Sequence, residues 1–109
     1  MERSIVKATE QFIEEIRKSD IYKEYDYQKE QLKRQPELFE KVLVYRSENY
    51  TIQNNTSEEE LFDRMDAFEK KYEKFLEIPL VDNFLQAELA FCRMMQEINV
   101  RITTDLDFE

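Results

Sequence analysis

The apolar residues between positions 79 and 104 recur at alternating intervals of four and three, the period of a long helix packed against other helices. The residues of this series, which we call the seam, are Leu80, Phe84, Ala87, Phe91, Met94 and Ile98. Four further apolar residues widen the seam on one side: Val81, Leu85, Cys92 and Met95. A surface helix of a small domain needs an apolar arc of only ~100°. The pattern therefore predicts a helix that touches more than one partner helix and that its own chain cannot fully cover.

Two helices are predicted in the first third of the chain. Residues 3–18 form an amphipathic helix, because apolar residues such as Ile5 and Phe12 recur on one face with helical spacing. Ser19 is a residue type that caps helix N-termini, so it starts a second helix over residues 20–34.

Two more helices precede the seam. Residues 36–53 begin with a proline, which suits the first turn of a helix. Ser57 and Glu60 have the spacing of a capping box for a fourth helix, and this helix ends at Ile78 because the residue before a proline avoids helical geometry. The fifth helix follows at once. We therefore predict one all-α domain over residues 1–109, with a long C-terminal antiparallel hairpin, packed as a dimeric helical bundle built largely on the fifth helix.

Composition and charge narrow the class of protein. The 109 residues contain no glycine and are 38% charged, which favours long helices and few turns. The net charge is −9, and the whole excess lies in residues 36–109, which hold 17 acidic and 8 basic residues. An acidic surface argues against nonspecific binding of nucleic acid or of anionic membranes. The sequence has no apolar run of membrane-spanning length, and its N-terminus lacks the apolar core of a signal peptide, so we expect a cytoplasmic protein.

The residue types that are missing also exclude chemistry. Without glycine there is no phosphate-binding loop, and without histidine there is no Ser-His-Asp arrangement and no histidine-ligated metal. Neighbouring carboxylates such as Glu14 and Glu15 lie on helix faces that should be solvated. The sequence therefore predicts no catalytic residues, no metal, no cofactor and no enzymatic activity.

Two features have both a structural and a functional interpretation. Cys92 lies beside the seam, where we predict a small buried side chain whose pKa is raised and which is unreactive; the alternative is a metal-cluster ligand or a redox role. Tyr22, Tyr25 and Tyr27 are expected to pack in the core or at its rim. The alternative, stacking on nucleic acid, would require a basic cluster near them.

The charged residue Glu88 interrupts the flank of the seam. It either marks the edge of the buried stripe or is a partly buried carboxylate that needs a partner. Arg46 is the best candidate by type, because its planar guanidinium group can hold a carboxylate through two hydrogen bonds. Arg46, Asn49 and Gln53 form one side of the third helix, which is either a solvated polar face or a specific contact with the fifth helix. We predict a buried polar pair between Arg46 and Glu88.

Several segments, in their order and spacing, resemble the YlbF/YmcA family of small helical bacterial proteins over nearly the full length of the chain. They are SDIYKEY at residues 19–25, PEL at 36–38, YRSENYTIQ at 45–53, PLV at 79–81, FLQAE at 84–88 and QEIN at 96–99. The resemblance implies an all-α fold that associates as dimers and a regulatory, non-enzymatic role in Gram-positive-type bacteria. Members of the family resemble adaptor subunits of complexes that bear on competence, sporulation, biofilm formation and RNA processing by a membrane-associated ribonuclease.

Some members of this family carry cysteines near the C-terminus that hold iron–sulfur clusters. This chain differs, because its single cysteine, Cys92, lies inside the predicted fifth helix. We therefore expect a regulatory adaptor that binds proteins as a homodimer, or as a hetero-oligomer with related helical subunits, through the six seam residues. The alternative is an RNA-associated factor that binds nucleic acid through its first two helices, which hold half of the basic residues.

Overall fold

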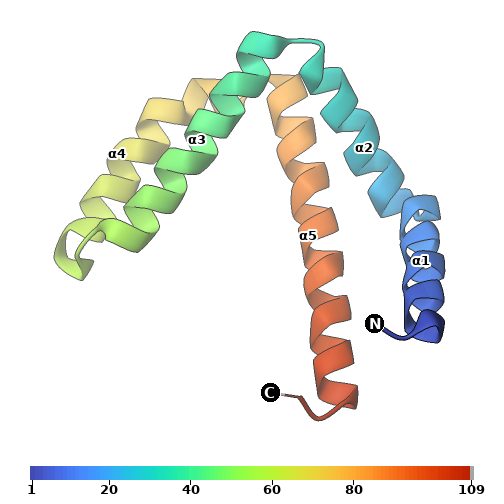
Figure 1. The fold of residues 1–109 in the computed structure, drawn as a ribbon. Coiled ribbons are helices and arrows are strands. Elements are labelled where there is room, and N and C mark those ends of the chain that lie inside the picture. The colour runs from blue at the N-terminus through green and yellow to red at the C-terminus, as the bar shows by residue number, and fades with distance from the viewer. Residues whose placement is uncertain (109) are drawn as a thin grey trace.

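The computed structural model describes residues 1–108 and consists of five α-helices joined by short turns (Figure 1). The helices are α1 (Arg3–Lys18), α2 (Asp20–Lys33), α3 (Pro36–Asn55), α4 (Glu58–Leu76) and α5 (Pro79–Asp105). The predicted all-α class is confirmed, and the helix ends differ from the predicted ones by no more than two residues.

Local chemistry accounts for most of the helix starts. Ser19 has an extended backbone, and its hydroxyl accepts a hydrogen bond from the Tyr22 amide at 3.1 Å, as an N-cap does. Pro36 and Pro79 occupy the first turns of α3 and α5. The predicted capping box at Ser57 is wrong: in the described chain its hydroxyl accepts no capping hydrogen bond. Three glutamates in the first turn of α4 stabilise this helix N-terminus instead, through the helix dipole.

The five helices form an open, V-shaped molecule (Figure 1). One arm is the antiparallel pair α3 and α4, and the other is α2 with α5, while α1 extends from the lower end of α2. The radius of gyration is 17.8 Å and the principal extents are 50 × 37 × 20 Å. A compact domain of about 100 residues has a radius of gyration of about 13 Å. The chain is therefore far more extended than a globule of its length.

The pairing of α5 differs from the predicted long hairpin. After the turn at Glu77 and Ile78, α5 diverges from α4 and runs along α2, while α4 packs against α3 (Figure 1). Aromatic contacts hold α5 to α2: the rings of Phe91 and Tyr25 stack with centroids 4.9 Å apart. The seam specified that α5 must be covered, but it carried no information on which helix covers it.

The core lies where the two arms of the V meet. Eight apolar side chains are buried among residues 1–108, and all come from α2 to α5: Leu32, Val42, Phe68, Tyr72, Phe75, Val81, Phe84 and Ala87. Tyr45 of α3 extends this core, since its ring stacks on that of Phe68 at 5.2 Å between centroids. The ends of both arms lie outside the core, and so does the whole of α1.

Candidate partner-binding surfaces

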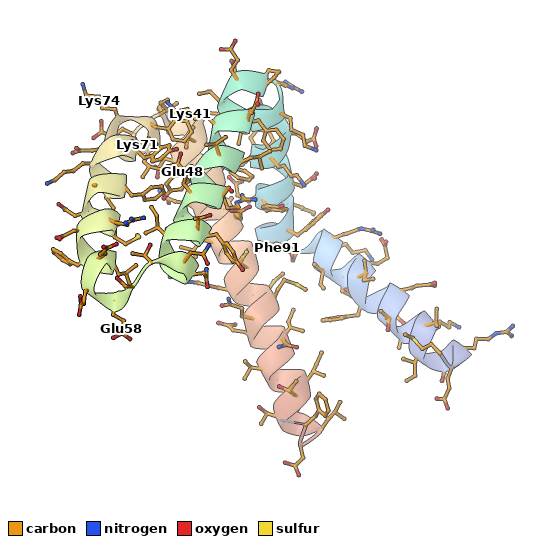
Figure 2. All side chains as sticks on the ribbon, turned by 60° about the vertical axis from the view of Figure 1, so that its left-hand side comes forward. Lys41, Glu48, Glu58, Lys71, Lys74 and Phe91 are labelled. Atoms are coloured by element: carbon orange, nitrogen blue, oxygen red, sulfur yellow. The ribbon has the colours of Figure 1, made fainter. Side chains whose placement is uncertain are left out.

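The first half of the seam is covered by the protein's own α2. Phe84 is only 2% exposed, Ala87 is buried, and Phe91 is half-buried between α5 and α2 (Figure 2). Tyr22 lies edge-on to Phe91 with centroids 5.6 Å apart, and Tyr25 stacks on the same ring. The packing predicted for Tyr22 and Tyr25 is therefore confirmed, whereas Tyr27 is 57% exposed and the packing predicted for it is wrong. A contact of these seam residues with a second chain stays a prediction.

The second half of the seam extends beyond α2. Met94 and Ile98 are half-buried, and Ile102 and Leu106 continue the same line at intervals of four towards the C-terminus. Both of these later residues are exposed. Both lie outside the predicted seam, which ended at Ile98, although apolar residues recur twice more at intervals of four.

An apolar groove separates this part of α5 from α1. The groove has a volume of about 470 Å³ and is lined by Phe12, Ile98, Arg101, Ile102, Asp105 and Leu106. None of the sixteen residues of α1, all of which the structure describes, is buried. Ile5, Phe12 and Ile13 are among its exposed apolar residues, and α1 points away from α5 in Figure 2. We call the apolar face of α1 together with residues 93–106 of α5 the α1–α5 surface.

The structure brings Arg46 and Glu88 together across α3 and α5. Arg46 Nη2 donates a hydrogen bond to Glu88 Oε2 at 2.5 Å. The side chains are 47% and 22% exposed, so the prediction that this pair is buried is wrong. α3 and α5 diverge from the core towards their far ends (Figure 1). The exposed fractions show that water reaches both groups of the pair. Gln53 donates to Asn49 at 3.0 Å on α3, so Arg46 is the member of the predicted polar stripe that bonds to α5.

A cleft of about 300 Å³ lies around this ion pair. Its lining residues are Tyr45, Arg46, Asn49, Leu85, Glu88, Leu89 and Cys92. The thiol of Cys92 is exposed, which contradicts the predicted buried position. Cys92 follows the seam residue Phe91, and one residue turns a helix by about 100°. Its side chain therefore faces the cleft, on the side of α5 from which α3 diverges.

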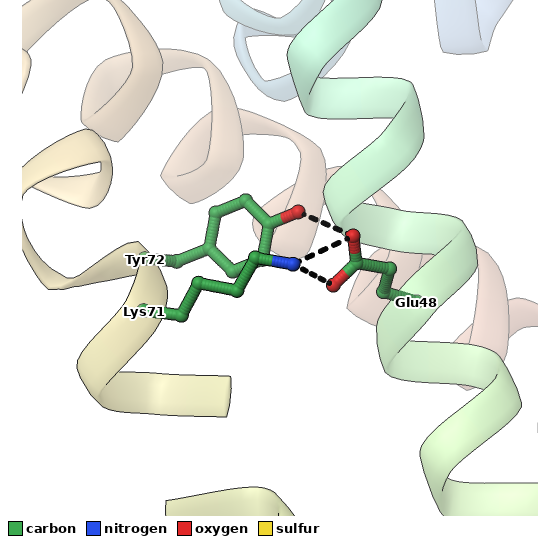
Figure 3. Close-up of polar contacts among 3 residues, drawn as sticks. All are labelled: Glu48, Lys71 and Tyr72. Atoms are coloured by element: carbon green, nitrogen blue, oxygen red, sulfur yellow. Dashed lines mark hydrogen bonds and ion pairs between the residues drawn. The ribbon is translucent and has the colours of Figure 1, made fainter. Parts of the chain in front are cut away.

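The carboxylate of Glu48 joins α3 to α4 in a contact that was not predicted from the sequence. Lys71 Nζ donates to both carboxylate oxygens at 3.1 and 3.2 Å, and Tyr72 Oη donates to Oε1 at 2.9 Å (Figure 3). The hydrogen bond from Tyr72 and then that from Lys71 lower the pKa of Glu48 below its ordinary value. Burial, followed by the hydrogen bond to Glu48, raises the pKa of Tyr72. This cluster fixes the register of the two helices within one arm.

Comparison with known proteins shows the family to which the chain belongs. The model of the family described as "Control of competence regulator ComK, YlbF/YmcA" matches residues 5–107 of the chain. The chain belongs to the YlbF/YmcA family. No curated protein and no solved structure matches it.

In this YlbF/YmcA protein, two of the segments that carried the resemblance meet at the cleft. Tyr45, Arg46 and Asn49 come from the segment at residues 45–53, and Leu85 and Glu88 come from FLQAE at 84–88. The YlbF/YmcA family is a family of regulators. Among residues 1–108, no helix has both the length and the apolar character that crossing a membrane requires.

Proposed function

We propose that this YlbF/YmcA protein is a cytoplasmic regulatory adaptor without enzymatic activity. It acts by binding proteins: a second copy or related helical subunits, together with a further protein partner. The family's description concerns control of the competence regulator ComK. We extend this regulatory role to the present chain, with sporulation, biofilm formation and RNA processing as the related processes that the family resemblance implies.

The observation that carries this proposal is the amount of surface that the single chain leaves uncovered. Its accessible surface is 8992 Å². A compact monomer of 13.4 kDa has about 6,500 Å², so the excess is about 2,500 Å². A protein–protein interface of standard size covers about 800 Å² on each partner. The open shape thus offers enough area for more than one partner, and its uncovered parts include large apolar side chains.

The charge distribution favours protein partners over RNA. The eight basic residues of the first 35 positions are interspersed with eight acidic ones. Three of these basic residues form ion pairs within their own helices: Arg17 with Glu14, Lys18 with Glu15 and Lys33 with Glu30. Such a surface is close to neutral and does not supply the positive face that phosphate binding needs. The RNA-binding alternative therefore lacks a supporting observation.

The proposal is tested by capture of the tagged protein from its own cells at native expression. The wild type is expected to retain related helical subunits and a regulatory partner that follow it through a second purification step. Leu89→Asp, a variant in the α3–α5 cleft, is captured in parallel, and the proteins that it retains are compared with those that the wild type retains. Leu89 is exposed, so its replacement leaves the core intact. Salt-sensitive binding of RNA by the purified chain, with no protein retained, would contradict the proposal.

A further inference from the structure

The face of α1 requires a partner that its own chain does not supply. Helices in proteins owe most of their stability to the packing of an apolar face against other elements. α1 has sixteen residues and makes its main contacts with the adjoining end of α2. Its side chains are all at least partly accessible. A lone chain would therefore expose an apolar stripe along the full length of α1.

The C-terminal half of α5 presents the complementary problem. Its apolar line runs from Ile98 through Ile102 and Leu106, beyond the part of α5 that α2 covers. Phe12 of α1 lines the other side of the apolar groove beside these residues. An apolar stripe on a helix must be buried against another element, and a helical bundle encloses such stripes in one core.

We propose that a second copy of this chain docks on the α1–α5 surface, so that α1 and the C-terminal half of α5 from each copy enclose one four-helix core. This inference rests on the proposed self-association and specifies its surface. The arrangement is isologous: the same residues of both copies face each other across a twofold axis. It places α1 in a core that only the dimer contains.

The available area suits a second copy. The excess accessible surface of about 2,500 Å² per chain is about three times the ~800 Å² that a standard interface takes from each partner. A standard interface at the α1–α5 surface would use about a third of this excess and would leave area for a further partner. Obligate homodimers bury apolar surface that resembles a divided domain core. The large exposed apolar residues of the α1–α5 surface have this character: Ile5, Val6, Phe12, Ile13, Ile102 and Leu106.

Charge also favours a second copy at this surface. Although the chain carries −9, α1 holds four basic and three acidic residues, and residues 93–105 of α5 hold two of each. Two copies therefore meet there without like-charge repulsion. The outer part of α4 differs, because the exposed ring of Phe62 stands beside Glu58, Glu59 and Asp66 on the same helix. Two such faces would repel one another.

The experiment measures dimer dissociation of the 109-residue chain by sedimentation equilibrium from nanomolar to high micromolar concentration. Phe12→Asp and Ile102→Asp alter the two sides of the groove, and both residues are more than two-fifths exposed, so the core is untouched. Each variant is expected to raise the dissociation constant by about 30-fold or more, the factor of an interface hot spot. Phe62→Asp is the matched control, because it places the same charge on another exposed phenylalanine, and its constant should equal that of the wild type.

Amide hydrogen exchange supplies a second measurement that does not depend on any substitution. Protection of the α1 amides is expected to fall on dilution below the dissociation constant, while protection in α3 and α4 persists. A wild-type dimer that neither Phe12→Asp nor Ile102→Asp weakens would overturn the proposed surface and leave self-association standing. A wild type that is monomeric at high micromolar concentration would overturn both.

Discussion

Replacing Phe84 by alanine tests whether α5 is held by its own chain at the apex of the V. Phe84 is 2% exposed and belongs to the core cluster, where its ring lies 6.1 Å from that of Tyr25 in α2. Truncation of a buried phenylalanine costs about 3–5 kcal/mol, because transfer free energy is lost and a cavity remains. A domain of this size has a free energy of unfolding of roughly 5–15 kcal/mol. The substitution is therefore expected to remove a large fraction of the stability.

Urea denaturation followed by circular dichroism measures this loss. The protein concentration is held constant, because the stability of an associating chain depends on it. Phe91→Ala serves as an internal scale: Phe91 is half-buried on Tyr25, so its replacement should cost less than that of Phe84. Phe62→Ala is the control, because a side chain that is 79% exposed should change the free energy of unfolding by less than about 0.5 kcal/mol.

The order of the three losses is the decisive result. The expected loss for Phe84→Ala is ~3–5 kcal/mol. If its free energy of unfolding lies within about 1 kcal/mol of that of the control, the packing of α5 on α2 described above is wrong. Weaker association of Phe84→Ala is expected only through loss of the folded chain, because its ring faces α2 inside the protomer. Dissociation without loss of stability would instead place Phe84 at the interface between chains.

Four further predictions concern the polar contacts and the cysteine. A double-mutant cycle on Arg46 and Glu88 should give a coupling of about 0.5–1 kcal/mol that shrinks in high salt, since water reaches both groups; a coupling indistinguishable from zero would remove this contact as a link between α3 and α5. Because the pKa of Glu48 is lowered in the folded state, its carboxylate stabilises the fold above pH 4.5, the ordinary pKa, and this stabilisation is lost as the pH falls. Glu48→Gln should therefore lose less stability on acidification than the wild type. The raised pKa of Tyr72 acts at the other end of the scale, because the stabilisation by its neutral hydroxyl is lost as the pH rises above about 10. The exposed thiol of Cys92 should react with a thiol reagent in the folded state nearly as fast as in urea, and slow modification would indicate a buried thiol instead. Cys92→Ala should keep both stability and association. Protein purified anaerobically should be colourless, because one cysteine per chain falls short of the about four ligands that an iron–sulfur cluster needs, and stoichiometric iron lost in Cys92→Ala would contradict this.

The sequence by itself determined the number, ends and faces of the helices, because these depend on neighbours within a few residues. Ser19 starts α2 through a side chain that bonds three residues ahead, and the prolines at 36 and 79 have a backbone suited to a first helical turn. The spacing of apolar residues marks the side of each helix that must be covered. The pairing of Glu88 with Arg46 was anticipated from residue type, because a carboxylate on the flank of a seam needs a partner and a guanidinium group can hold it through two hydrogen bonds.

Only the tertiary structure decided which helices cover which faces. The seam shows only that one face of α5 is apolar, and the sequence-based prediction that α4 covers it was wrong. In the structure α2 covers α5. Because α5 runs along α2 and away from α4, the molecule is an open V and the α1–α5 surface is uncovered. Exposure followed from the same choice: Arg46, Glu88 and Cys92 lie on the side of α5 from which α3 diverges, so all three remain accessible to water. Burial depends on contacts between residues distant in sequence, and the apolar pattern of a single helix does not contain that information.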